Sequence, residues 1–131
     1  MSEPERAAVE IVRAAYDATA AGDYERFLSL FAPGAVVQQS AGPPWVMKPE
    51  GEEITTFAER VGWYIRSAQT VDEIFHSGDE VIVIGRSRGE AVRTGRSFDV
   101  RIVHRWVIVD GAVVRWHLMV EQAPLLEALA E

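Results

Sequence analysis

Three histidines, His76, His104 and His117, are the side chains of this sequence best suited to proton transfer near neutral pH. The absence of cysteine excludes disulfides, thiol nucleophiles and cysteine-type zinc sites. His76 precedes a Ser-Gly-Asp turn, so we expect it at the surface. Two interpretations of His104 stay open: a catalytic acid, base or oxyanion donor, or a buried histidine hydrogen-bonded to a hydroxyl such as that of Tyr16.

The geometry of the last hairpin decides what faces His104. A two-residue turn at Asp110-Gly111 places His104 opposite His117, with Glu121 two positions beyond, and these three side chains could hold a metal ion. A three-residue turn with a bulge at its glycine places Trp116 opposite His104 instead and turns His117 and Glu121 outward. We expect the bulged turn, and with it no metal ion or other cofactor. The apolar alternation that favours it is formed by Val114, Trp116, Leu118 and Val120.

Helical spacing of apolar residues dominates the first half of the chain, and strand alternation dominates the second. A first helix runs from Ala8 to Ala20, Gly22 ends it, and Asp23 caps a second helix. The resulting order, α-α-β-α-β-β-β-β-α, predicts a single α+β domain over residues 1–131. The other expected elements are a short strand at Ala35–Gln39, a helix at Gly51–Ser67, strands at Val71–His76, Glu80–Arg93, Arg96–Val109 and Val113–Gln122, and a C-terminal helix at Leu125–Ala130.

The hairpin around Thr94-Gly95 is predicted to have two unlike faces. With a two-residue turn, Gly85 would face His104 and Ser87 would face Ile102, so small residues on one strand oppose large ones on the other. Such a stripe lets a sheet bend or leaves room for a ligand, and a bent sheet closed by helices makes a cone with a hollow. The other face is interpreted as an outer face with salt bridges, or alternatively as an anion or partner site. Its charged residues are Arg86, Arg88, Arg101, Arg105, Glu90 and Asp99.

The amino-acid composition limits which kinds of partner the protein is expected to bind. The chain has 131 residues, with 13 basic and 20 acidic side chains and a formal charge of −7, which argues against nucleic-acid binding. The longest purely aliphatic run, Val81–Ile84, is far too short for a membrane span. The polar, acidic segment Met1–Glu5 does not resemble a signal peptide. A cytoplasmic protein with no nucleic-acid or membrane partner is therefore expected.

Five short segments, taken in their order along the chain, indicate a known family. They are Ala20–Asp23, a helix end at Phe31–Gly34, a strand at Val36-Val37, the run His104–Gly111, and Val113–Trp116, which follows that run. Together they resemble the SnoaL-like and ketosteroid-isomerase-related proteins of the nuclear-transport-factor-2-like superfamily, over nearly the whole chain. The resemblance implies a cone-shaped, curved, mixed or antiparallel sheet wrapped around three helices of the N-terminal half.

The resemblance also implies roles for single positions. In ketosteroid isomerases an Asp at the end of the first strand is the base, and the matching residue here is Gln39. Their first-helix Tyr, an oxyanion donor, matches Ala15, with Tyr16 one residue along, and their second donor, a late-strand Asp, matches His104. SnoaL-type cyclases pair a strand His with an acid on the next strand, where this chain has Leu118. The signature acids are thus missing, and His104 is the candidate catalytic residue.

Two functions stay open at this stage. One is a cofactor-independent isomerase, cyclase or lyase that binds a small apolar, ring-containing molecule and transfers a proton through His104. The other is a non-catalytic ligand-binding or dimerisation module that has lost the acids of its family. The expected substrate-binding residues are Tyr16, Gln39, Trp45, Ser87, Trp106, Trp116 and Leu118.

The three tryptophans of this set either pack in the core or form an aromatic lining, and Trp45 lies in a Pro-rich loop that could roof the cone mouth. A homodimer through the outer sheet face is also predicted. Apolar residues mingle there with the charged ones, namely Ile82, Ile84, Val103 and Val107.

Overall fold

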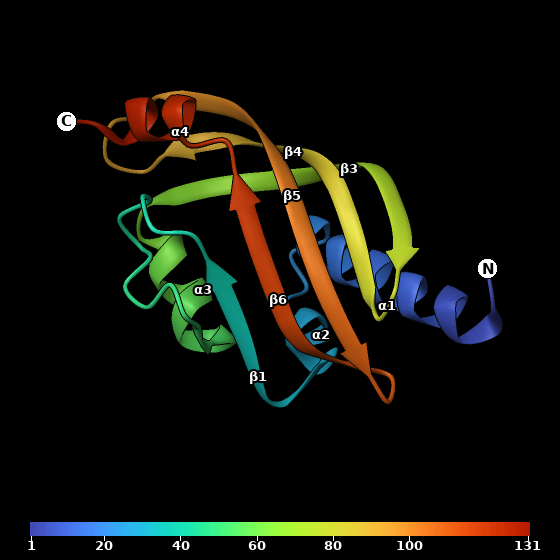
Figure 1. Ribbon diagram of the computed structural model, residues 1–131. Helices are drawn as coiled ribbons and strands as arrows, with labels where there is room; N and C mark the ends of the chain where they lie inside the picture. The colour runs from blue at the N-terminus through green and yellow to red at the C-terminus, as the bar shows by residue number, and fades with distance from the viewer.

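The computed structural model describes all 131 residues as one curved, unclosed sheet with helices against its concave side (Figure 1). Six strands lie in the order β2-β1-β6-β5-β4-β3. Only β1 and β6 run parallel, so the sheet is mixed, as the sequence predicts. The elements are α1 (Glu3–Ala20), α2 (Tyr24–Ser29), β1 (Phe31–Gln39), β2 (Glu52–Glu53), α3 (Ile54–Gly62), β3 (Ile65–Ser77), β4 (Glu80–Ala91), β5 (Ser97–Val109), β6 (Ala112–Val120) and α4 (Gln122–Leu129).

Helix α1 is defined by its ends and by one buried face. Ser2 and Glu5 form a reciprocal capping box at its start, and Gly22, with a φ of 71°, follows its end. Val12 and Ala15 are fully buried against the sheet, and Tyr16 is nearly so. The helical periodicity of this segment therefore fixes which face of α1 meets the sheet, and with it the direction of Tyr16.

Strand β3 corrects the predicted third helix. That helix, expected over Gly51–Ser67, is confined to α3, and the chain is extended from Ile65 onward. Glu53 caps α3 by accepting from the backbone N–H groups of Thr55 and Thr56. The helical stripe that includes Ile65 is equally compatible with strand alternation through Ser67 and Gln69, and pairing with β4 decides in favour of the strand.

The β4–β5 register differs from the predicted one by two residues. Residues 92–96 connect the strands, instead of the two-residue turn at Thr94-Gly95. Val83 therefore faces His104, and Gly85 faces Ile102. A shift of two leaves every side chain on its predicted face, because side chains alternate with a period of two.

The β5–β6 hairpin combines parts of both predicted alternatives. Its turn has two residues, Asp110 and Gly111, both with positive φ (50° and 79°), and Val109 pairs with Ala112. A bulge in β6 then shifts the register, so His104 faces Leu118 rather than Trp116 or His117. The alternative in which His104, His117 and Glu121 hold a metal ion is thus wrong, because His117 pairs with Arg105 on the other face of the sheet.

Two glycines of β4 let the sheet bend closely around the helices. A Cβ atom at Gly85 would lie 2.0 Å from the carbonyl oxygen of Thr70, and one at Gly89 would lie 2.0 Å from that of Arg66. No larger residue fits there without moving the β3 backbone. The stripe of small residues therefore serves the close approach of β3, and the large residues of β5 face a hollow.

Candidate functional site

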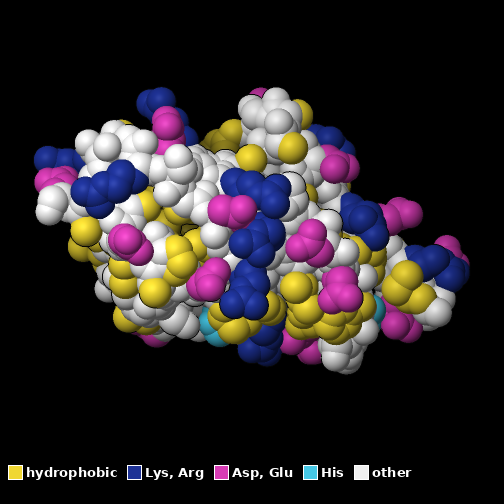
Figure 2. Space-filling view, turned by 90° about the horizontal axis from the view of Figure 1, so that it is seen from above, with side chains coloured by type: hydrophobic (Ala, Val, Ile, Leu, Met, Phe, Trp, Pro, Cys, Tyr) yellow, Lys and Arg dark blue, Asp and Glu magenta, His cyan; other side chains and the backbone are white.

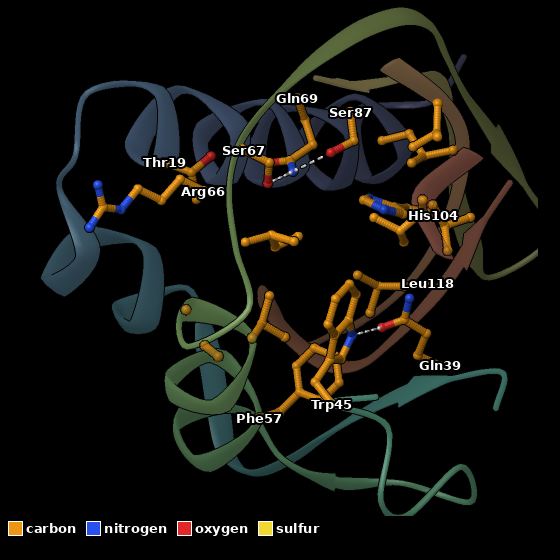
Figure 3. Close-up of a pocket in the computed structure, with 18 of the residues that line it drawn as sticks. Thr19, Gln39, Trp45, Phe57, Arg66, Ser67, Gln69, Ser87, His104 and Leu118 are labelled. Carbon is orange, nitrogen blue, oxygen red and sulfur yellow. Dashed lines mark hydrogen bonds between the residues drawn. The ribbon is translucent and has the colours of Figure 1, made fainter. Parts of the chain in front are cut away.

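A cavity of about 410 Å³ lies between the concave face of the sheet and the helices. This volume falls within the range of about 300–1,000 Å³ typical of small-molecule sites. No Asp or Glu side chain lines it. Six predicted site residues do line it, namely Gln39, Trp45, Ser87, His104, Trp116 and Leu118 (Figure 3).

Tyr16 and Trp106, two further predicted substrate-binding residues, lie behind His104 and do not line the cavity. The Tyr16 hydroxyl is 2.5 Å from His104 Nδ1, and Trp106 Nε1 donates to the same hydroxyl at 3.2 Å. An indole N–H can only donate, so the Tyr16 oxygen accepts from Trp106 and its proton is free to point to His104. His104 Nδ1 then accepts, and the proton of the imidazole resides on Nε2.

His104 is uncharged at neutral pH. Burial lowers its pKa from 6.5 to about 3, because the cation would lose its hydration inside the fold. Burial also raises the pKa of Tyr16 above its usual value of 10, so the phenol keeps its proton. The pair Tyr16–His104 is therefore neutral, and Nε2, which makes no hydrogen bond within the protein, is a donor.

Gln39 is held by the loop that precedes α3. Trp45 Nε1 donates to Gln39 Oε1 at 2.8 Å, and both side chains are buried. Arg60 in turn donates from Nε to the carbonyl oxygen of Trp45 at 2.8 Å and forms an ion pair with Glu52. Trp45 is thus fixed from both its backbone and its ring, and a roof over the cone mouth stays a prediction.

An aromatic wall backs the imidazole. The ring of Trp116 stacks on Trp106 with a centroid distance of 4.6 Å and meets His104 edge-on at 5.3 Å. Trp116 Nε1 has no hydrogen-bond partner, although solvent does not reach this atom. The predicted alternatives of core packing and lining thus divide between the two residues: Trp106 is fully buried core, and Trp116 borders the cavity.

Sequence reasoning predicted Ser87 but missed its two partners in a polar row on the opposite side of the cavity, Ser67 and Gln69. Gln69 Nε2 lies 3.3 Å from Ser67 Oγ and 3.4 Å from Ser87 Oγ, and all three residues line the cavity (Figure 3). Ser67 and Gln69 belong to the segment that was expected to be helix end and loop. The period-two sequence from Ile65 through Ser67 and Gln69 to Val71 is the signal that identifies them.

Comparison with known families settles the family of the chain. A family model described as the SnoaL-like domain matches residues 12–116. The chain belongs to the SnoaL-like family. This family is part of the nuclear-transport-factor-2-like superfamily, which the sequence motifs also predict. No curated protein matches this SnoaL-like chain significantly.

Solved structures share the fold over its full extent. An NTF2-like protein of unknown function from Burkholderia pseudomallei is 25% identical, with a TM-score of 0.85 and 100% of both chains covered. TerC, co-crystallised with polyporic acid, is 22% identical, with a TM-score of 0.81 over 94% of this chain and 98% of its own. A candidate SnoaL-like polyketide cyclase from Jannaschia is 18% identical, with a TM-score of 0.80 over 98% and 95%.

Two further structural findings bear on metal ions and membranes. No group of three or more His, Cys, Asp or Glu side chains is arranged to hold a metal ion. None of the four helices combines the length and the apolar character that crossing a membrane requires.

Proposed function

We propose that this SnoaL-like protein binds a small, mainly apolar molecule that has a ring and a carbonyl oxygen, and that His104 polarises the carbonyl by donating its Nε2–H. The observation that carries the proposal is the chain of hydrogen bonds from Trp106 through Tyr16 to His104, which leaves Nε2–H free at the cavity. A preorganised neutral donor stabilises negative charge as it develops on a carbonyl oxygen.

The lining supports an apolar ring ligand. Aromatic and aliphatic side chains make up most of the wall, among them Trp45, Trp116 and Leu118. A flat ring packs well against such a wall. TerC, which shares the fold, was co-crystallised with polyporic acid, and this supports a small-molecule ligand for this chain.

In an isomerase or cyclase reaction, His104 would hydrogen-bond the enolate oxygen while water or hydroxide from the solvent takes the proton from the neighbouring carbon, because no carboxylate lines the cavity. Its low pKa makes it a weak base, so its role is that of an electrophile, one of the roles predicted from the sequence. A second candidate function, non-catalytic binding, is favoured by one observation: the cavity lining contains no carboxylate that could accept the proton.

A matched pair of ligands tests the proposal. 2-Acetylnaphthalene carries a carbonyl, and 2-ethylnaphthalene has the same skeleton without it. We expect the wild type to bind the ketone at least roughly fivefold tighter, since one net hydrogen bond contributes about 1 kcal/mol. His104→Phe should bind the hydrocarbon as the wild type does and lower the preference for the ketone about fivefold, as measured by equilibrium dialysis. No binding of either compound would contradict the proposal.

Deuterium exchange separates the two functions. If the protein acts on the bound ketone, the methyl protons of 2-acetylnaphthalene exchange faster in D₂O with the wild type than with His104→Phe, as seen by NMR. Binding without any acceleration of exchange identifies a non-catalytic binding protein.

We also propose a homodimer through the outer sheet face. Ile84 is 36% exposed there, close to the ion pairs that Asp99 makes with Arg86 and Arg88. Figure 2 shows a band of basic side chains, with acidic side chains beside it and hydrophobic ones at its edge. A charged band beside apolar residues offers a second copy of the chain both ion pairs and apolar contacts across a two-fold interface. Sedimentation equilibrium should give twice the chain mass, and a monomer at high micromolar concentration would contradict this.

A further inference from the structure

The cavity holds a second polar group whose orientation is fixed, the side-chain amide of Gln39. An amide has one end that accepts and one that donates, and either end can face a ligand. Trp45 decides between them, because its indole N–H can only donate and bonds Oε1 at 2.8 Å. The Nε2 end makes no hydrogen bond within the protein, and Figure 3 shows it on the arm of the amide away from Trp45.

The register places this amide and His104 on either side of one residue. Gln39 pairs with Leu118 across β1 and β6, and His104 pairs with Leu118 across β6 and β5. Side chains opposite one another in neighbouring strands share a face of the sheet, and strands lie about 4.8 Å apart. Gln39 and His104 are therefore two strands apart on the concave face, with Leu118 as an apolar floor between them.

We infer that Trp45 makes the cavity selective for a carbonyl oxygen over a hydroxyl at this position, by holding the Gln39 amide with its N–H₂ toward the ligand. The inference rests on the proposed function. A carbonyl oxygen above Leu118 has two lone pairs, one for His104 Nε2–H and one for Gln39 Nε2–H. A hydroxyl there accepts equally well, but its own proton meets no acceptor at Gln39, because the bond from Trp45 holds Oε1 on the side of the amide away from the ligand.

An unmet hydroxyl proton in a buried site is costly, so a site built from fixed groups discriminates strongly between ligands. The fixation also has structural support. Trp45 is 3% exposed, so its indole is enclosed by packed neighbours, and Arg60 holds its backbone by donating to its carbonyl oxygen while pairing with Glu52. Trp45 thus acts through Gln39 as a positioning residue.

The test compares 2-acetylnaphthalene with 1-(2-naphthyl)ethanol, its alcohol, and with 2-ethylnaphthalene as the unsubstituted reference. Equilibrium dialysis gives the dissociation constant of each. We expect the wild type to bind the ketone roughly fivefold to tenfold tighter than the alcohol. Trp45→Phe keeps the ring but removes the N–H, so the amide is free to turn and accept the hydroxyl proton. The ketone-to-alcohol ratio should then fall to about one, mainly through tighter binding of the alcohol.

Three further variants keep the result interpretable. Gln39→Met removes the donor and should weaken the ketone about fivefold while leaving the hydrocarbon unchanged. Trp63→Phe is the matched control, because Trp63 is 63% exposed and outside the cavity, and its ratio should equal that of the wild type. A Gln69→Leu background removes the other amide oxygen of the lining, so the alcohol cannot satisfy its proton there.

The outcomes distinguish this inference from the proposed function. A wild type that binds ketone and alcohol equally, or a Trp45→Phe variant that keeps the full wild-type ratio, overturns the role of Trp45 while leaving the preference for ketone over hydrocarbon in place. Failure of all three ligands to bind overturns the proposed function and this inference together.

Discussion

The two faces of strands β4 and β5 differ in their chemistry although they alternate residue by residue along the same backbone. On the concave face, His104 is buried, uncharged and hydrogen-bonded to Tyr16. On the convex face, Asp99 accepts from Arg86 at 2.7 Å and from Arg88 at 3.1 Å, in solvent. Burial rather than residue type therefore decides which polar groups have altered chemistry, because solvent screens the outer pairs, whereas His104 is 4% exposed.

The outer pairs still have a consequence for the inner face. The observed register places Arg88 directly opposite Asp99, whereas the register predicted from a two-residue turn would place Glu90 there. Opposite charges across a strand pair are favourable and like charges are not. The charges of the convex face thus help to select the register that sets Val83, rather than Gly85, against His104.

The largest effect is expected from the core of the concave face. Trp106 is fully buried, so Trp106→Ala should reduce the free energy of unfolding by about 3–5 kcal/mol. Trp63→Ala, at a position 63% exposed, should change it by less than about 0.5 kcal/mol. Urea denaturation measures both. A Trp106 variant no less stable than the Trp63 variant would contradict the assignment of Trp106 to the core.

The second effect is a dependence on pH. The pKa of His104 is about 3 in the folded chain and near 6.5 when unfolded, so the unfolded state takes up the proton first as the pH falls. This contribution to stability is complete above pH 6.5 and is lost below it, at up to about 1.4 kcal/mol per pH unit.

A His104→Phe variant provides the comparison for that slope. It lacks this group, so its free energy of unfolding should fall less steeply than that of the wild type between pH 6.5 and pH 4.5. The other titrating groups are common to both proteins and cancel in the difference. Parallel pH profiles from urea denaturation would show that His104 is not held neutral.

A smaller loss is expected for Tyr16→Phe. The change keeps the ring but leaves Trp106 Nε1 and His104 Nδ1 without their partner, which should cost about 1–3 kcal/mol of unfolding free energy. The binding of 2-acetylnaphthalene should also weaken, because the imidazole proton is no longer confined to Nε2. Unchanged stability and binding would contradict the role of the Tyr16 hydroxyl in orienting His104.

The smallest effect is expected on the convex face. Asp99→Asn removes the charge shared by Arg86 and Arg88, but solvent surrounds all three side chains. We expect a minor loss of stability at low ionic strength that disappears when salt is added. A loss of unfolding free energy as large as that of Tyr16→Phe would contradict the difference between the concave and the convex face.

Much of the fold follows from sequence periodicity. The apolar stripe of α1 and the alternation of β4, β5 and β6 predict the α+β architecture, and they place His104 and Leu118 on one face. The positions of the bulge in β6 and of the five-residue connection could not be derived, because a register depends on cross-strand pairing that no single strand reveals.

The sequence predicted more of the residues of the site than of the hydrogen bonds between them. Gln39, Trp45 and His104 were candidates, yet their hydrogen bonds join residues far apart in the chain. Tyr16 and His104 are separated by 88 positions, so only the packing of α1 against the sheet brings them together. Ser67 and Gln69 were missed because their segment also fits the end of a helix.

The central claim is that His104 presents Nε2–H to the cavity as a neutral donor. Long-range ¹H–¹⁵N correlation NMR of the uniformly ¹⁵N-labelled protein reports the protonation of each imidazole nitrogen, and His104→Phe assigns the signals. The account predicts a protonated Nε2 and an unprotonated Nδ1 for His104 at pH 7, unchanged on lowering to pH 5. A doubly protonated ring, or a proton on Nδ1 with Nε2 bare, would contradict it.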